Sequence, residues 1–301
     1  MEWLAKSANQ GDPYGQINLG EIYRSGFGVR KDLAKAMELY ILAANQGLGM
    51  ALCAIGTMYH DGEGVPKDES KAMEWYLKAA YQGDGHGMNL VGLMFLEMTG
   101  FQPDYFKAMA WFHKAANKGY AEAYFNLGRM YENGKGVPRD YYKAIVWFQK
   151  TADKGHARSQ FAIGEMYCHG RGVLKDYTEA MEWLLKSANN EDAKAQIIIG
   201  DMYRNGEGVP KDFSKAMEWY TKAAKQEDAD AYTRIGTLYH DGTGVLRDRA
   251  KAETLYRKAV AKGNAEAQFC LDWMHNDDQG AQIDQSKAMM FRKVAEDKDP
   301  D

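Results

Sequence analysis

The sequence has little of what marks several common classes of protein. Its 301 residues include three cysteines, Cys53, Cys168 and Cys270, which are too few for a disulfide framework and favour a reducing compartment. No run of about 18 apolar residues occurs, and the start Met1-Glu2-Trp3 does not resemble a signal peptide. These absences predict a cytoplasmic protein without a membrane span.

The charge balance also excludes a class of partner. The chain has 38 Lys plus Arg against 42 Asp plus Glu, a net charge of −4, and no polybasic block. Because a nucleic-acid binder is expected to concentrate positive charge, we expect no nucleic-acid partner. With 45% hydrophobic and 27% charged residues, the composition is that of a folded protein with one large domain or two ordinary ones.

The dominant feature is an internal repeat of 36 residues. Segment 64–80 recurs at 208–224 with two changes, Phe213 for Glu69 and Thr221 for Leu77, and the offset of 144 is four times 36. An aspartate recurs at every step of 36: Asp32, Asp68, Asp104, Asp140, Asp176, Asp212, Asp248 and Asp284. A strict period of this length is typical of a solenoid in which each unit contacts its neighbours. We number repeat positions by the first repeat, so position 20 comprises Gly20, Gly56 and so on.

Each repeat is predicted to hold two helices. Leu52, Ile55 and Tyr59 follow a helical spacing, and so do Ala72, Tyr76 and Ala79. The recurring aspartates are interpreted as N-caps of the second helix, and paired glycines such as Gly62 and Gly64 as the turn that ends the first helix. The small residues at positions 20 and 36 permit close helix packing. Two aromatic ladders are expected in the core: Tyr23, Tyr59, Phe95, Tyr131, Tyr167, Tyr203 and Tyr239 at one position, and Trp75, Trp111, Trp147, Trp183 and Trp219 at another.

These signals predict an all-α fold, a right-handed α/α superhelical solenoid of eight helix-turn-helix repeats after one N-terminal helix. The helix is expected at 1–10, the repeats at 11–46, 47–82, 83–118, 119–154, 155–190, 191–226, 227–262 and 263–298, and a tail at 299–301. Arg292 and Glu296 replace stacking residues and predict a C-terminal cap. The start of the chain is expected to be trimmed from a longer protein or used for self-association, which predicts a monomer or a weakly self-associating protein.

The motifs carry a family resemblance. Ala121 to Tyr131, Gly134 to Asp140 and Lys143 to Trp147 resemble the Sel-one-like repeat family, a relative of the tetratricopeptide repeats, and the likeness extends over residues 11 to about 296. The resemblance implies a solenoid whose first helices line a concave surface used as a scaffold or adaptor for protein partners. Two features depart from the family: the cysteines lie at different repeat positions, so no disulfide within a repeat is expected, and segment 98–103 lacks the usual glycine turn.

The variable positions of the first helices are the predicted binding surface. By analogy with the related repeats, positions 14, 17, 21 and 24 face the concave groove, and a mixture of apolar anchors and charges there suits a protein or peptide ligand. The predicted partner-binding residues are Tyr14, Leu93, Leu96, Phe125, Arg129, Phe161, Glu165, Arg204 and His240. An alternative interpretation assigns position 17, which includes Phe125 and Phe161, to packing between helices.

No catalytic, metal or cofactor site is predicted. His60 and His240 lie in twin Tyr-His-Asp-Gly strings five repeats apart, and neither has a metal-binding spacing. Cys168 and His169 are neighbours, so on a helix they point about 100° apart and make a poor nucleophile and base. We therefore expect a non-catalytic scaffold. The alternative is a bacterial inhibitor or immunity-type protein that blocks a partner enzyme, and a hydrolase ranks last.

Overall fold

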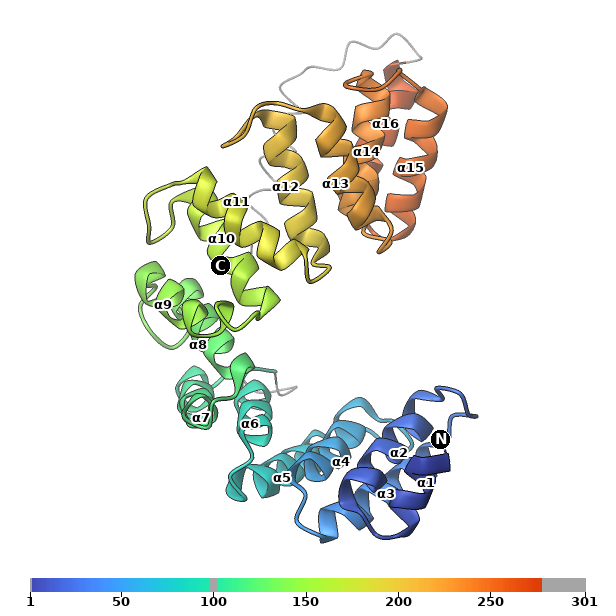
Figure 1. Cartoon of the computed structure of the whole chain (residues 1–301), viewed down its shortest axis with the longest axis vertical. Coiled ribbons are helices and arrows are strands. Elements are labelled where there is room, and N and C mark those ends of the chain that lie inside the picture. The colour runs from blue at the N-terminus through green and yellow to red at the C-terminus, as the bar shows by residue number, and fades with distance from the viewer. Residues whose placement is uncertain (1, 98–101, 278–301) are drawn as a thin grey trace. The chain divides into compact units, whose positions relative to one another are not determined.

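The computed structural model describes residues 2–97 and 102–277, and all regular secondary structure in these residues is α-helical (Figure 1). The chain divides into two compact units, Met1–Trp147 and Phe148–Asp301, and the boundary falls inside one helix, α9 (Tyr141–Ala152). The expected C-terminal cap at Arg292 and Glu296 lies outside the described residues.

The helices have 12 or 13 residues each, except the first, which has 8. In the first unit they are α1 (Glu2–Asn9), α2 (Pro13–Ser25), α3 (Leu33–Asn45), α4 (Gly49–Asp61), α5 (Glu69–Tyr81), α6 (Gly85–Glu97), α7 (Tyr105–Asn117) and α8 (Ala121–Asn133). In the second unit they are α10 (Ala157–His169), α11 (Tyr177–Ala188), α12 (Ala193–Asn205), α13 (Phe213–Ala224), α14 (Ala229–Asp241), α15 (Arg249–Ala261) and α16 (Ala265–Asp277). We call the even-numbered helices from α2 onward first helices, and the odd-numbered helices from α3 onward second helices.

Within each unit, a first helix packs against the second helix that follows it, and that second helix packs against the next first helix. The series runs α2, α3, α4, α5, α6, α7, α8 in the first unit and α10 to α16 in the second. In the first unit, α4 and α6 also touch each other directly. The prediction of an all-α solenoid of helix pairs is confirmed.

Local chemistry sets where the helices begin and end. The Asp68 carboxylate accepts a hydrogen bond from the backbone N–H of Lys71 at 2.9 Å, and the aspartates of the other described repeats cap their second helices in the same way. Gly62 ends α4 in the left-handed conformation at φ 74°, and Gly64 at φ 71° comes so close to Leu33 that a Cβ would lie 2.7 Å from the leucine Cβ. The caps and turns predicted from the repeat are therefore confirmed at these positions.

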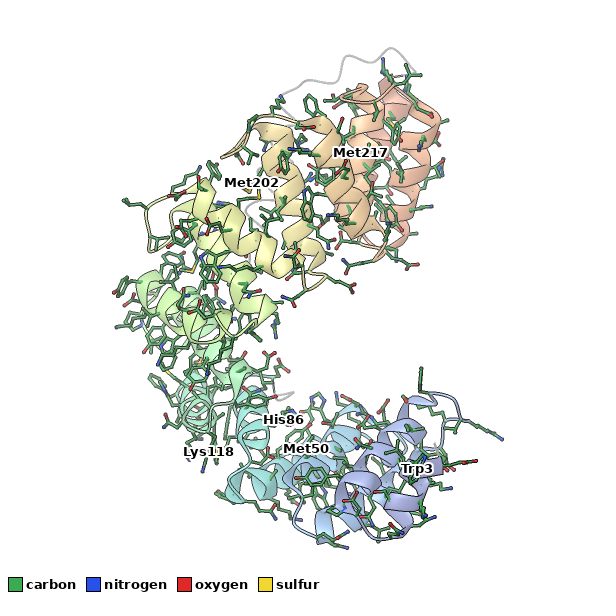
Figure 2. The ribbon with its side chains drawn as sticks, in the orientation of Figure 1. Trp3, Met50, His86, Lys118, Met202 and Met217 are labelled. Atoms are coloured by element: carbon green, nitrogen blue, oxygen red, sulfur yellow. The ribbon has the colours of Figure 1, made fainter. Side chains whose placement is uncertain are left out.

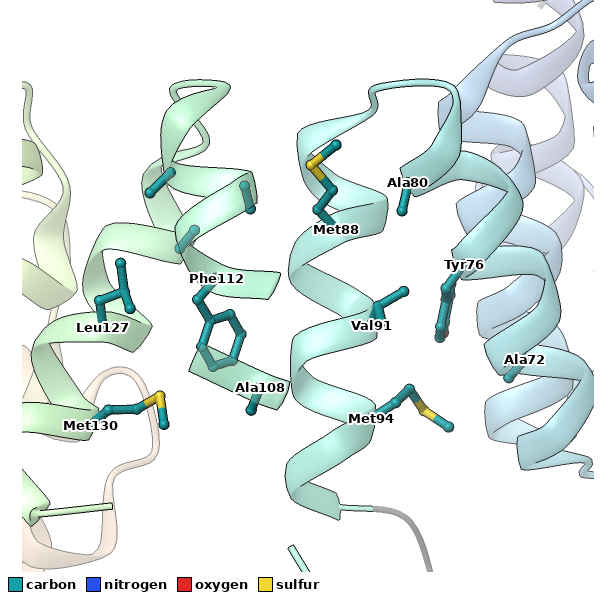
Figure 3. Close-up of a cluster of buried hydrophobic side chains, with 13 residues drawn as sticks. Ala72, Tyr76, Ala80, Met88, Val91, Met94, Ala108, Phe112, Leu127 and Met130 are labelled. Carbon is teal, nitrogen blue, oxygen red and sulfur yellow. The ribbon is translucent and has the colours of Figure 1, made fainter. Parts of the chain in front are cut away.

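The core repeats one contact between a small and a large side chain. On the first helix stands the glycine of position 20, and on the second helix a large residue lies over it: Tyr40, Tyr76, Phe112, Leu184, Tyr220 and Tyr256 each face the glycine of their own repeat. Phe112 and Tyr220 are 0% exposed. Figure 3 shows the arrangement around α6, where Val91 and Met94 face Tyr76 of α5 while Phe112 of α7 lies on the other side.

The tryptophan ladder lies at the edge of this core. Trp75, Trp111 and Trp219 are half-buried and pack against the clusters of fully buried residues. A lysine one turn later covers the ring, with Lys78 Nζ at 3.9 Å from the Trp75 ring centroid and Lys222 Nζ at 3.5 Å from that of Trp219. The expectation that tryptophans form the core holds only for part of each ring, and the deepest aromatic position is the one occupied by Tyr40 and Phe112.

The buried tyrosines make stability sensitive to alkaline pH. Burial and the carboxylates of Glu21 and Asp201 raise the pKa of Tyr40 and Tyr220 well above the ordinary value of about 10. Because the folded pKa is raised, the stabilisation is complete below about pH 10 and is lost as the unfolded tyrosines ionise above it. We expect urea unfolding to show a fall in stability above pH 10 of up to about 1.4 kcal/mol per pH unit for each such tyrosine. An alkaline slope that persists unchanged after both tyrosines are replaced with phenylalanine would contradict this assignment.

Candidate functional site

Neighbouring first helices of the first unit lie side by side and present one surface. The Asn126 amide on α8 donates to Asn89 Oδ1 on α6 at 2.9 Å, and the Arg24 guanidinium on α2 lies 3.7 Å from the Asp61 carboxylate at the end of α4. We call the exposed side chains of α2, α4, α6 and α8 the first-helix surface of the first unit.

The second unit repeats this arrangement with ion pairs. Arg234 on α14 lies between two neighbouring helices, with its Nε 3.4 Å from Asp201 Oδ1 on α12 and its Nη1 2.8 Å from Glu266 Oε1 on α16. Burial lowers the pKa of Arg234, but the two carboxylates outweigh it and the net shift is upward. The exposed side chains of α10, α12, α14 and α16 form the first-helix surface of the second unit.

In the first unit, the structure exposes some of the predicted site residues and buries another. Tyr14 is 60% exposed on α2, and Arg129 is exposed on α8, where its Nη1 pairs with Glu132 Oε2 at 2.7 Å. Leu93 and Leu96 are half-buried against the core around α6. Phe125 is 6% exposed, so the prediction that it faces a partner is wrong.

In the second unit, the predicted residues are less accessible than expected. Phe161 is half-buried against the core formed with Leu184, and Glu165 is half-buried. Arg204 is half-buried, with Nη2 3.4 Å from Asp201 Oδ1. His240 is 5% exposed, because its ring packs 4.9 Å from the Trp273 ring and its Nδ1 lies 2.8 Å from the Asp241 carboxylate. The prediction that His240 is exposed to a partner is wrong.

Position 17 accounts for the error at Phe125. Its side chains insert between consecutive repeats: Ile17 shares a buried cluster with Ala51 and Ile55 of the next repeat, and Ile197 does the same with Ile235. Six side chains at this position are buried, and Phe161 and Phe269 are half-buried. The exposed fractions of the buried ones are Ile17 7%, Cys53 1%, Asn89 3%, Phe125 6%, Ile197 7% and Thr233 0%. The alternative interpretation, that position 17 packs between helices, is confirmed at Ile17 and Ile197.

Position 21 has a structural partner that the sequence analysis missed. Tyr40 Oη donates to Glu21 at 2.7 Å, Tyr220 Oη donates to Asp201 at 2.6 Å, and Thr57 shares a hydrogen bond with Tyr76 at 3.2 Å. In the third repeat, Phe112 replaces the tyrosine and Leu93 replaces the polar residue. In the structure these polar groups satisfy a buried tyrosine hydroxyl. The sequence signal for this contact is a tyrosine 19 residues after a polar side chain.

Exposed apolar side chains at position 14 distinguish the first unit. Met50 on α4 is 52% exposed and occupies the same repeat position as Tyr14. At this position the second unit has only charged residues, Arg158, Lys194, Asp230 and Glu266. Figure 2 shows Met50 and His86 on the neighbouring helices α4 and α6. At position 14, the first-helix surface of the first unit can therefore supply apolar contacts, and that of the second unit supplies charge.

The two buried thiols, Cys53 and Cys168, have different neighbours. Burial, with a smaller effect of Glu165, raises the pKa of Cys168 to about 11, so the thiol is protonated at neutral pH and a poor nucleophile. Burial and Asp84 raise the pKa of the Cys53 thiol. The structure also brings Cys53, Asp84 and His86 together, with their ligating atoms all within 4.8 Å of one another. This cluster was not expected from the sequence, which shows no short metal-binding spacing.

The repeated helix pairs and their shared first-helix surfaces define the chain as an α/α solenoid repeat protein. The sequence profile of the Sel1 repeat matches residues 1–12, 13–48, 49–84, 85–120, 121–156, 157–192, 193–228 and 229–264. The chain belongs to the Sel1 repeat family, as the motifs indicate.

Two solved structures are similar to the chain over most of its length. A Sel1 repeat protein from Oxalobacter formigenes is 35% identical, with a TM-score of 0.71 over 90% of this chain and 79% of that one. A protective antigen of uropathogenic Escherichia coli strains, which displays an SLR fold, is 33% identical, with a TM-score of 0.71 over 99% of this chain. The chain spans 64% of the antigen's length. No curated protein matches the chain.

Among the helices of residues 2–97 and 102–277, none combines the length and the apolar character that a membrane span requires.

Proposed function

We propose that the protein is a non-catalytic scaffold that binds a protein or peptide partner on its first-helix surfaces. The Sel1 repeat fold commonly serves protein interaction. The observation that carries the proposal is the contrast between two positions of the repeat. Position 20 is glycine in seven successive repeats, whereas position 14 changes from Tyr14 to Met50, His86 and Glu122 along the first unit. Variation at an accessible position suits selective recognition, because position 20 is held by packing in every one of these repeats.

The apolar anchors are assigned to the first unit. Tyr14 and Met50 are the large apolar side chains exposed by more than half on its described first helices. Tyrosine and methionine are enriched at protein interfaces, since each offers a large contact area. Leu93 and Leu96 flank this area with half-buried apolar surface.

The charged contacts are assigned to the accessible ionic side chains. Arg129, Glu165 and Arg204 keep partial exposure, and Lys194 is exposed on α12. Charges at the rim of an interface mainly set the association rate and the choice of partner. Phe125 and His240 are left out of the proposed interface because the core holds them.

Substitution of the exposed anchors should abolish partner binding. We expect the double variant Tyr14→Ala with Met50→Glu to lose a bound partner by at least about tenfold, because aromatic anchors at interface centres often contribute 2 kcal/mol or more. The measurement is affinity purification of the tagged chain from its native cells, with quantitative mass spectrometry of the proteins bound by each variant.

The matched control is Phe106→Glu, which changes a side chain that is 77% exposed on the second helix α7. The control variant should keep the same partner at the wild-type level. Equal retention by both variants, or equal loss from both, would count against the first-helix surface as the binding site.

An inhibitor or immunity-type role stays a prediction that uses the same surface. It would be distinguished by the activity of the captured partner, which a scaffold leaves intact and an inhibitor suppresses. A cytoplasmic location and weak self-association also stay predictions.

A further inference from the structure

Three different metal-ligating side chains meet where the second and third repeats join. Cys53 lies on α4, Asp84 immediately precedes α6, and His86 is the second residue of α6. The ligating atoms of the three side chains all lie within 4.8 Å of one another, and Cys53 Sγ is 3.9 Å from Asp84 Oδ1. Cys53 is buried, while Asp84 and His86 are half-buried, so one side of the cluster is reached from solvent.

Neighbouring residues hold the cluster in place. Asp84 Oδ1 accepts the backbone N–H of Gly87 at 2.7 Å, which fixes the carboxylate at the start of α6. The His86 ring stacks on Tyr120 with 5.4 Å between ring centroids and 27° between planes. Gly49 lies one turn before Cys53 on α4, and a Cβ there would fall 2.7 Å from Asp84 Oδ2. The glycine therefore leaves the space that the carboxylate occupies beside the thiol.

The other repeat junctions show that the fold does not need this set of residues. The three equivalent positions are filled by Ile17, Leu48 and Met50; by Asn89, Tyr120 and Glu122; by Phe125, His156 and Arg158; by Phe161, Asp192 and Lys194; by Ile197, Asp228 and Asp230; and by Thr233, Asn264 and Glu266. A cysteine, an aspartate and a histidine coincide at one junction only.

We propose that Cys53, Asp84 and His86 bind a Zn²⁺ ion that links the second and third repeats. A thiolate, an imidazole and a carboxylate are the ligand types that Zn²⁺ prefers, and three protein ligands leave a fourth position for water. Ligand atoms around a tetrahedral zinc ion lie about 3.5 Å apart, so the side chains must turn inward by roughly 1 Å. The thiol proton leaves as the sulfur coordinates the metal.

Cobalt provides a direct spectroscopic test. Metal-free full-length protein is titrated with Co²⁺, and binding by Cys53 should give a thiolate-to-cobalt charge-transfer band that saturates near one equivalent and disappears when Zn²⁺ is added. The band should be lost in Cys53→Ala. In His86→Gln the apparent affinity for Co²⁺ should fall at least about tenfold, because even the loss of a group that only supports a ligand typically costs that much. The matched control Cys168→Ala removes another buried thiol and should keep the band.

Thermal unfolding supplies a second readout. Free Zn²⁺ at about 100 times its dissociation constant should raise the unfolding midpoint of the wild type and of Cys168→Ala by roughly 5 °C, and Mg²⁺ should not. Circular dichroism establishes whether each variant is folded. If Cys53→Ala does not fold, His86→Gln still tests the proposal. A wild-type protein without the charge-transfer band, or a band that persists in Cys53→Ala, would overturn the proposal.

Discussion

Replacing Phe112 with alanine is expected to reduce the free energy of unfolding by about 3–5 kcal/mol. Phe112 is 0% exposed and lies in the cluster that joins α6, α7 and α8 through Val91, Met94 and Leu127. The loss has two parts: the transfer free energy of the removed ring atoms and the cavity left against Gly92, which the fixed spacing of the helices prevents from closing. Urea denaturation followed by circular dichroism measures the change.

The same helix offers a matched control. Phe106 lies on α7 as well but is 77% exposed, so Phe106→Ala should change the free energy of unfolding by no more than about 0.5 kcal/mol. Both substitutions remove the same atoms from the same helix. A similar loss from both would contradict this account, because alanine favours a helix more than phenylalanine does and only the buried contact of Phe112 accounts for a larger loss there.

A larger side chain at Gly92 is expected to destabilise the protein although it favours the helix. Gly92→Ala should gain about 1 kcal/mol of helix propensity in isolation. The new Cβ, however, would lie 2.6 Å from Phe112 Cε1, and overpacking of this kind costs about 1–3 kcal/mol or more. We therefore expect a net loss of up to about 2 kcal/mol in the free energy of unfolding.

A double-mutant cycle isolates the contact. In the Phe112→Ala background the space beside Gly92 is vacated, so adding Gly92→Ala should be neutral or stabilising. The coupling between the two substitutions should exceed about 1 kcal/mol. Additive effects would show that the glycine is not required by the ring across from it.

The fold could be predicted from the sequence because each of its signals is local and repeated. Asp68 caps a helix through residues three positions away, and Gly62 ends one through its own backbone conformation. The depth of each side chain was harder to predict. A helical pattern shows which residues share a face, but Ile17 and Ile197 are buried by the next repeat, which lies outside that pattern.

The candidate sites were predictable to different degrees. Tyr14 was predicted to be exposed by analogy with the related repeats, and it is. The same analogy failed at His240, which is covered by Trp273, 33 residues later. The cluster of Cys53, Asp84 and His86 escaped for the same reason. Asp84 and His86 lie 31 and 33 residues after Cys53, a spacing that places side chains together only when consecutive repeats stack.

Site-specific photo-crosslinking tests the central claim most directly. A photoreactive amino acid is placed at Met50 on the first-helix surface or, as the matched position, at Phe106 on a second helix, and the chain is irradiated in its native cells. Both side chains are more than half exposed, so accessibility alone does not separate them. We predict that position 50 crosslinks to one discrete protein and position 106 does not. Crosslinking of that protein at position 106 with none at position 50 would contradict the proposed binding surface.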